Sequence, residues 1–408
     1  MKVGLLNILI GLVVAAIGLA VSFGSYEAVA GKGGTYYVAW GAVVFGALQA
    51  LIGLVRVVIA VFTKEGRGEI GTLLWPKGAL SRGIRVGVLA VAAAIGWLIA
   101  PESWKTVSPT PLRTFSVGDD TNTIAYTPDS QWIAVADGYG GLEIFNVASG
   151  AEGKAPVLDA YQDVQAVAFS PDGKVLAAAT NSGLRLWSSP DWSHVAPVLT
   201  GQAKDGNYAV AFSPDGKEVA TGSVNHGALV WNAADASRLS TSTSSNADVS
   251  AVAFSPDGSL IAAGDESGDV ILHKSDGTYL RSFDAEDFLP IHTLALFRDG
   301  RLAVGGYEAP GVRIYDIADG KLLAKLEAPV PLFKKAGSIW SIALSPDQSL
   351  IASGNSDNAI RIWDAKTYRL IRSIFGHKSD VTAVAYAPDG HTLASGSDHV
   401  VKIWANAP

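Results

Sequence analysis

The feature that most constrains the fold is a short motif that recurs seven times. Each copy is an apolar alternation followed by Ser-Pro-Asp-Gly or a variant of it, and its aspartates are Asp129, Asp172, Asp215, Asp257, Asp299, Asp347 and Asp389. The intervals between them are 43, 43, 42, 42, 48 and 42 residues. A nearly fixed period of this length is typical of stacked supersecondary units, each of which buries its apolar face against its neighbours.

Each copy has the pattern of a small antiparallel sheet. A strand such as 164–169 precedes the turn, in which Pro presets φ and Gly tolerates a positive φ. A second strand such as 175–179 follows the turn, and a polar fourth strand such as 368–373 ends the copy. The third strand ends in an aromatic or similar residue in every copy: Phe145, Trp187, Trp231, His273, Tyr315, Trp363 and Trp404. Four strands in each of seven copies predict an all-β, seven-bladed β-propeller.

The seventh copy needs a strand from elsewhere in the chain. It stops at Trp404 and has no fourth strand, whereas a spare strand precedes the first copy. Because open sheet edges favour wrong pairing, we expect residues 112–117 to complete blade seven. The propeller domain is thus predicted over 112–408.

The best-preserved copy is the last one, which carries Gly376-His377 and, further along, Ser395, Asp398 and Trp404. With these residues and the seven-fold period, the sequence resembles the WD-repeat family over about 109–408. The resemblance implies that these four side chains form a buried, structural hydrogen-bond tetrad. Blade six keeps Ser353, Asp357 and Trp363-Asp364 but lacks the Gly-His pair, and the other copies are more degenerate. The resemblance also implies a role in protein interactions.

The first hundred residues differ in character and predict a membrane region. Apolar runs over about 3–23, 36–58 and 84–100 approach the 20 or so residues that span a bilayer. Residues 101–111 are then a linker. The loop at 63–85 carries five basic residues, so the positive-inside rule places it in the cytoplasm. The N-terminus is then cytoplasmic, the anchor lies in the inner membrane of a bacterial cell, and the propeller is extracytoplasmic, hence periplasmic.

Two other interpretations of this region stay open. The first run resembles a secretory signal with cleavage after Ala30, although the run is longer than the usual signal core. Small residues at helical spacing also suit a channel or transporter. Apart from Arg85 at the start of the third run, Arg56 is the only charge within the runs, which favours a simple anchor.

Charge and cysteine content exclude several classes of function. Residues 1–100 hold 8 Lys and Arg with 3 Asp and Glu, so the remainder holds 23 basic and 35 acidic residues, a net charge of −12. An acidic domain repels phosphate backbones, so nucleic acid is not an expected partner. The chain has no cysteine, which excludes disulfides and thiolate metal sites.

The binding surface is predicted from the repeat. The residue seven positions before each repeat aspartate starts an innermost strand, which gives Asn122, Gln165, Tyr208, Ser250, His292, Trp340 and Thr382. Of these we select Trp340, Tyr208, His292 and Gln165 as binding candidates, with most weight on Trp340 and Tyr208 because exposed aromatic side chains commonly anchor interfaces. The longest interval adds an apolar, proline-rich segment with Phe333, Lys334 and Lys335. This segment is expected to bind a partner or, alternatively, to plug the mouth of the central channel of the propeller.

Catalysis is not expected. The seven histidines lack a metal-binding spacing, and no Gly-rich stretch links a strand to a helix as a phosphate loop does. Asp119-Asp120, or Asp284 with Glu286 and Asp287, can hold a cation loosely or simply be solvated. We therefore expect neither a cofactor nor a metal. The predicted function is a membrane-anchored protein-interaction scaffold, and the alternative is a ligand-binding or hydrolytic propeller for a small molecule or glycan.

Overall fold

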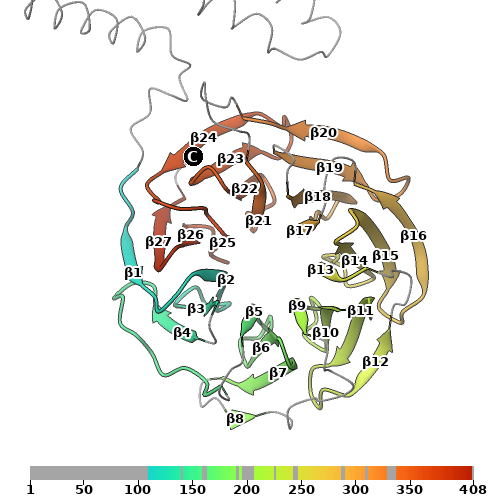
Figure 1. Cartoon of the computed structure of the whole chain (residues 1–408), viewed down its shortest axis with the longest axis horizontal. Helices are drawn as coiled ribbons and strands as arrows, with labels where there is room; N and C mark the ends of the chain where they lie inside the picture. The colour runs from blue at the N-terminus through green and yellow to red at the C-terminus, as the bar shows by residue number, and fades with distance from the viewer. Residues whose placement is uncertain are drawn as a thin grey trace, which may run out of the picture. The chain divides into compact units, whose positions relative to one another are not determined.

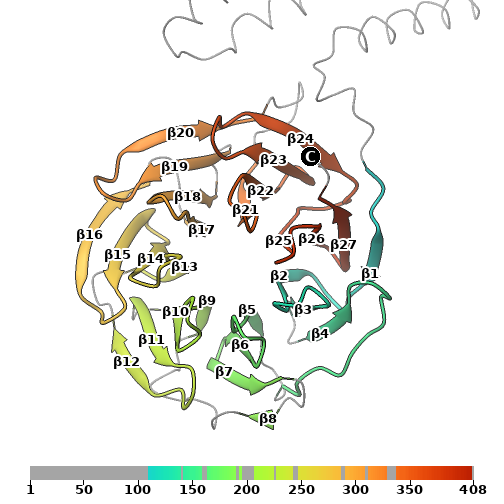
Figure 2. The same cartoon turned by 180° about the vertical axis from the view of Figure 1, so that it is seen from behind.

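The computed structural model describes residues 109–406, except for 139–140, 159–162, 190–192, 195–205, 225–226, 242–246, 286–289, 308–310 and 329–336. In this part the chain forms seven antiparallel sheets around a central axis, as Figures 1 and 2 show from opposite sides. The predicted all-β, seven-bladed propeller is therefore confirmed.

Each sheet is one blade, and its strands follow one another outwards from the centre. Blade one comprises β2 (Thr121–Tyr126), β3 (Trp132–Asp137) and β4 (Leu142–Asn146). Blades two and three comprise β5 (Val164–Phe169), β6 (Val175–Thr180), β7 (Gly183–Ser188) and β8 (Ser193–His194), then β9 (Asn207–Phe212), β10 (Glu218–Ser223), β11 (Gly227–Asn232) and β12 (Arg238–Thr241). Blades four and five comprise β13 (Val249–Phe254), β14 (Leu260–Asp265), β15 (Asp269–Lys274) and β16 (Tyr279–Asp284), then β17 (Ile291–Leu296), β18 (Arg301–Gly306), β19 (Val312–Asp316) and β20 (Leu322–Leu326). Blades six and seven comprise β21 (Ile339–Leu344), β22 (Leu350–Asn355), β23 (Ala359–Asp364) and β24 (Leu370–Phe375), then β25 (Ala383–Tyr386), β26 (Thr392–Ser397) and β27 (Val400–Ala405).

Blade one departs from the expected four strands. Its sheet has three named strands, and among the described residues the outer edge of β4 pairs only at the bridge between Phe145 and Glu152. The Gly153 amide donates to the Ile144 carbonyl at 2.7 Å next to this bridge. The pairing ends before Pro156, which has no amide proton to donate to a ladder. The expectation of a full fourth strand in every copy was therefore wrong for blade one.

Blade seven is completed by the start of the domain. Strand β1 (Arg113–Ser116) pairs antiparallel with β27, with Phe115 opposite Val401, so the sheet order is β1-β27-β26-β25. The innermost strands β2 and β25 also contact each other, which closes the ring between the first and last blades. The two ends of the domain are thus held together within one blade.

The repeated motif forms the turn between the first two strands of each blade. In blade two the Ser170 hydroxyl donates to Asp172 Oδ1 at 2.7 Å and accepts the Val175 amide at 2.9 Å. Gly173 takes the positive φ of 71° that ends the turn. The same serine–aspartate bond occurs at Asp257 and Asp347, and hydrogen bonds from serine and backbone groups lower the pKa of both carboxyls to about 2. The repeat aspartates in these copies therefore stabilise turns.

The aromatic position of the third strand lies in the core of every blade. The seven residues predicted for it are all at most 6 % exposed: Phe145, Trp187, Trp231, His273, Tyr315, Trp363 and Trp404. They pack against alanines and branched residues of the second strand, such as Ala178 and Leu176 against Trp187. Burial of these large side chains supplies much of the apolar area that stabilises each sheet.

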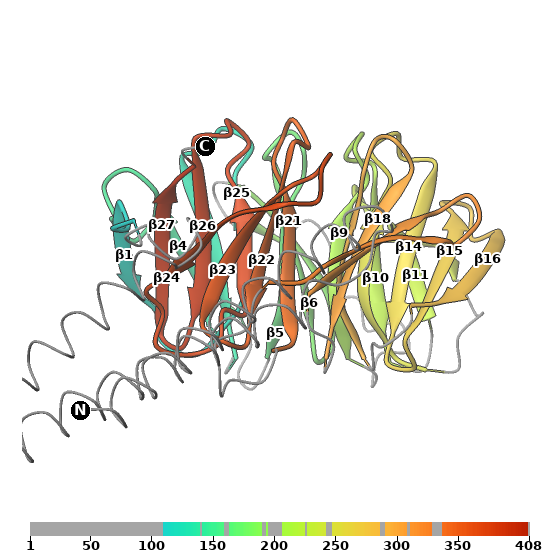
Figure 3. The same cartoon turned by 90° about the horizontal axis from the view of Figure 1, so that it is seen from above.

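Neighbouring blades approach closely along their inner strands. Gly264, at the end of β14, faces Ile291 at the start of β17, and a Cβ added to Gly264 would lie 2.6 Å from Ile291 Cγ2. Glycine therefore lets one blade pack directly on the next. The strands run between the two faces of the disc, as Figure 3 shows from the side. We call the face opposite the Ser-Pro-Asp-Gly turns, where the innermost strands begin, the top face.

The predicted membrane helices at about 3–23, 36–58 and 84–100 and the cleavage site after Ala30 lie outside the described residues, as does the linker up to residue 108. Among the residues that are described, no helix has the length and hydropathy needed to cross a bilayer.

Candidate functional site

Small polar residues at the start of the innermost strands join neighbouring blades. The Asn122 side chain donates to the Val164 carbonyl of the next blade at 3.0 Å. The hydroxyls of Ser250 and Thr382 likewise donate to backbone carbonyls of the following blades, at Ile291 and Thr121. These three ring positions therefore have a structural role, which leaves the larger side chains as candidates for binding.

Two of the four candidates, His292 and Trp340, lie together on the top face. They occupy the second positions of β17 and β21, and their ring centroids are 4.6 Å apart. Tyr307, which follows β18, joins them with ring centroids 6.3 Å from Trp340 and 6.4 Å from His292. Tyr307 is 43 % exposed, and Trp340 and His292 are half-buried. The result is an accessible aromatic cluster over blades five and six.

Asp380 completes this cluster from blade seven. The Trp340 indole N–H donates to Asp380 Oδ2 at 3.1 Å. Burial lowers the pKa of His292, so its ring is neutral at pH 7. Its Nε2 is buried without a hydrogen-bond partner among the described residues. We call Trp340, His292, Tyr307 and Asp380 the top-face cluster.

The other candidates lie elsewhere or outside the described residues. Tyr208 is 38 % exposed at the start of β9, and its pKa is raised by burial and by the carboxylates of Asp248 and Glu266. Gln165 is half-buried in blade two. Phe333, Lys334 and Lys335 lie outside the described residues, so their proposed binding role stays a prediction.

Three of the four residues in the predicted tetrad of blade seven are joined by hydrogen bonds. Trp404 Nε1 donates to Ser395 Oγ at 2.7 Å, and Ser395 Oγ lies 2.6 Å from His377 Nε2. Burial, and to a lesser extent the Lys402 ammonium, lower the pKa of His377 to about 4. The imidazole is therefore neutral, and we infer that its Nε2 accepts a hydrogen bond from the Ser395 hydroxyl group.

Asp398 does not take part in this hydrogen-bond network, so the prediction of a four-membered tetrad was wrong for Asp398. Its side chain is 53 % exposed and lies 3.3 Å from His399 Nε2, with the Ser379 hydroxyl at 3.4 Å. It is also a neighbour of Asp120, whose pKa is raised by burial and then by this second carboxyl group. In blade six the corresponding Asp357 forms a two-point ion pair with Arg361. In blade seven the neighbours of Asp398 thus replace the expected His377 contact, and in blade six, which lacks the Gly-His pair, Arg361 is the partner of Asp357.

Replacing Ser395 by alanine tests the three-membered chain. The buried Trp404 N–H would lose its acceptor and His377 its donor, so we expect a loss of about 1–3 kcal/mol in the free energy of unfolding. Ser353→Ala in blade six is the matched control, because Trp363 Nε1 lies 3.4 Å from Ser353 Oγ and this longer bond is weaker. Equal losses in urea unfolding of the two variants would contradict this account.

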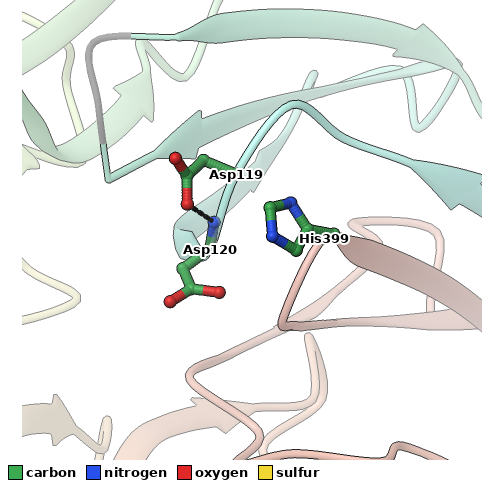
Figure 4. A group of neighbouring side chains, drawn as sticks. All are labelled: Asp119, Asp120 and His399. Atoms are coloured by element: carbon green, nitrogen blue, oxygen red, sulfur yellow. Dashed lines mark hydrogen bonds between the residues drawn. The ribbon is translucent and has the colours of Figure 1, made fainter.

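One group of potential metal ligands occurs among the described residues. The ligand atoms of Asp119, Asp120 and His399 all lie within 4.8 Å of one another, where the loop after β1 meets the turn between β26 and β27 (Figure 4). Asp119 Oδ1 already accepts the Asp120 amide at 2.7 Å, and His399 Nδ1 lies 3.1 Å from the Gly118 carbonyl. These contacts account for the arrangement, and we assign no metal to it. Glu286 and Asp287 of the other acidic group lie outside the described residues.

Comparison with known families identifies the repeat. The model of the family described as WD domain, G-beta repeat matches five segments: 155–188, 197–232, 237–274, 320–364 and 368–405. These segments fall within blades two to seven.

Curated relatives match only part of the chain. Protein groucho of Drosophila melanogaster is 32 % identical over 115 residues, which are 28 % of this chain and 15 % of that protein. Pre-mRNA-processing factor 19 homolog 2 of Arabidopsis thaliana is 28 % identical over 90 residues, or 22 % of this chain and 16 % of that protein. The chain therefore spans about a sixth of the length of these relatives.

Solved structures share the fold. A chain in the structure titled Crystal Structure of Mitotic Checkpoint Complex aligns with a TM-score of 0.65 over 76 % of this chain and 98 % of that chain, at 19 % identity. At this identity the likeness concerns the propeller fold alone.

Proposed function

The chain belongs to the WD40 repeat family, and we propose that it is a membrane-anchored scaffold whose propeller binds protein partners through its top face. The observation that carries this proposal is the top-face cluster. Tyr307 and Trp340 present aromatic surface beside the carboxylate of Asp380. Aromatic residues of this kind supply large contact area at little cost in side-chain entropy and are frequent energetic centres of interfaces.

The family match supports the same class of function, because propellers built from this repeat are suited to scaffolding. The net charge of −12 over 101–408 disfavours nucleic acid as a partner. We propose binding without catalysis, because the buried His273 packs in the core of blade four and the half-buried His377 is held by Ser395 of blade seven.

Partner capture tests the role of the top face. The full-length protein is solubilised gently from membranes, and wild type is compared with Trp340→Ala and with Tyr279→Ala. Tyr279 is a matched control, because it is 50 % exposed on the outer strand β16 and so lies away from the channel. Truncation of a hot-spot side chain costs about 2 kcal/mol or more of binding free energy. Trp340→Ala should therefore weaken partner binding roughly thirtyfold, while Tyr279→Ala leaves it unchanged.

Two outcomes would count against this proposal. Equal capture by all three proteins would remove the top-face cluster as the binding surface. Capture of no protein by the wild type would favour the small-molecule or glycan alternative.

The membrane location rests on the sequence, and introduced cysteines test it. The chain has no natural cysteine, so a single Ala234→Cys in an exposed propeller turn reports where the propeller lies. If the propeller is periplasmic, a membrane-impermeant maleimide will label this variant in intact spheroplasts. Ser81→Cys, in the basic 63–85 loop, should react only after lysis. The reverse pattern would overturn the proposed orientation.

A further inference from the structure

A second repeated position lies on the top face, two residues before each ring residue. In chain order this position holds Asp120, Asp163, Gly206, Asp248, Pro290, Ser338 and Asp380. In six blades its carbonyl accepts an amide N–H from the turn after the second strand, as in the bonds from Asn181 to Asp163 at 3.1 Å and from Glu266 to Asp248 at 3.0 Å. The position is therefore structurally equivalent in these six blades, whereas in blade seven no such bond to the Asp380 carbonyl occurs among the described residues. Four blades carry an aspartate at this position.

One of these aspartates hydrogen-bonds an aromatic side chain of the preceding blade, and the charge of a second acts on another aromatic side chain. Asp380 accepts the indole N–H of Trp340. Asp248 lies close enough to Tyr208 that its charge contributes, after burial, to the raised pKa of that phenol. In both pairs the aspartate follows the aromatic residue by 40 positions, because the ring geometry repeats. Of these two pairs, Trp340 and Asp380 are in direct contact.

The pair at Trp340 is the more complete of the two. Tyr307 adds an exposed ring beside the half-buried Trp340, and the neutral His292 brings no competing positive charge. Among the described residues, Asp380 has no Lys, Arg or His partner in an ion pair. A half-buried carboxylate next to aromatic faces is a favourable environment for a cation, because the ring quadrupole and the negative charge both attract it.

We propose that Trp340, Tyr307 and Asp380 bind an arginine or lysine side chain presented by the protein partner. This inference rests on the proposed function and names the chemistry of the partner surface. The guanidinium or ammonium group contacts the aromatic rings and pairs with Asp380, while the acidic propeller attracts a basic segment over longer distances. Binding should therefore weaken as the salt concentration rises.

The test uses the full-length protein in detergent with ¹⁵N-labelled tryptophan. The Trp340 indole resonance is assigned by its disappearance in Trp340→Phe. Three pentapeptides that differ only in a central arginine, glutamine or glutamate are then titrated. The arginine peptide should shift this resonance saturably, and the glutamine and glutamate peptides should bind at least fivefold more weakly. Asp380→Asn keeps an acceptor for the indole N–H but removes the charge, and it should weaken arginine-peptide binding about tenfold.

Asp163→Asn is the matched control. It removes the same charge at the same loop position, but the ring residue of the preceding blade is Asn122, whose side chain donates to the Val164 carbonyl. We expect this variant to bind the arginine peptide as the wild type does. Equal binding of the three peptides, no saturable shift at millimolar concentrations, or equal effects of Asp380→Asn and Asp163→Asn would each overturn the inference.

Partner capture separates this inference from the proposed function. If Trp340→Ala loses the partner while Asp380→Asn captures it at the wild-type level, the binding surface stands and the cationic contact is wrong. If neither variant loses the partner, both proposals are wrong.

Discussion

Replacing Phe115 by alanine should lower the free energy of unfolding by about 3–5 kcal/mol, the range found for truncation of a buried aromatic side chain. Phe115 lies on the strand that closes the ring and is 5 % exposed. Its ring stacks on Phe145 of blade one, with centroids 5.2 Å apart and planes 5° from parallel. It also packs in one cluster with Val401 and Ile403 of β27. The truncation would leave a cavity where the two ends of the domain meet.

The neighbouring residue provides the control for this prediction. Thr114 is exposed and pairs with Lys402 in the same ladder, so Thr114→Ala should change stability by no more than about 0.5 kcal/mol. Urea unfolding of the full-length protein, with hydrogen exchange of the β27 amides, measures both variants. A loss below about 1 kcal/mol in Phe115→Ala would show that β1 contributes little to closure.

The architecture could be predicted because it depends on periodic features of the sequence. The turn chemistry of the copy at Asp172, the alternation of strands such as β5 and the aromatic position at Trp187 all recur at a fixed spacing. Each of these features acts locally, so the copies can be compared without knowing the fold. The outer strand is less regular, and blade one shows that its pairing can shrink to a single bridge at Glu152.

Hydrogen-bond partners were harder to predict, because they depend on side-chain rotamers and on competing groups nearby. Spacing placed Asp398 in the same relation to Trp404 as Asp357 has to Trp363. Yet Asp357 pairs with Arg361 on its own strand, and Asp398 turns towards Asp120 and His399. A carboxylate binds the best available donor or charge, and the repeat pattern does not specify which one is closest.

The top-face cluster was predicted in part. Counting from the repeat aspartates identified Trp340 and His292, which do lie together. Tyr307 and Asp380 were missed, although a signal existed, since Asp380 stands two residues before a ring position that had already been identified. Extending the same count by two positions would have shown the repeated aspartates of the top face.

His273 should make the propeller sensitive to acid. It takes the place of an aromatic residue in blade four, is 2 % exposed, and contacts the Tyr279 ring with centroids 5.9 Å apart. Burial lowers the pKa of His273 to about 4. In the unfolded chain the pKa of histidine is about 6.5, so the unfolded state binds a proton between these values and the folded state does not. Stability is therefore full above pH about 6.5, falls by roughly 1.4 kcal/mol per pH unit, and has lost about 3 kcal/mol by pH about 4.

His273→Phe isolates this contribution, because blade one already carries Phe145 at the corresponding position. The pKa of His377 is lowered as well, so both proteins should lose stability in acid. The free energy of unfolding of the wild type should nevertheless decline more steeply, and the difference between the two proteins should change by about 3 kcal/mol from pH 7 to pH 4. Urea unfolding of each full-length protein across this range gives the two curves. Parallel curves would mean that His273 is protonated as readily in the folded blade as in the unfolded chain, and that its burial in blade four carries no electrostatic cost.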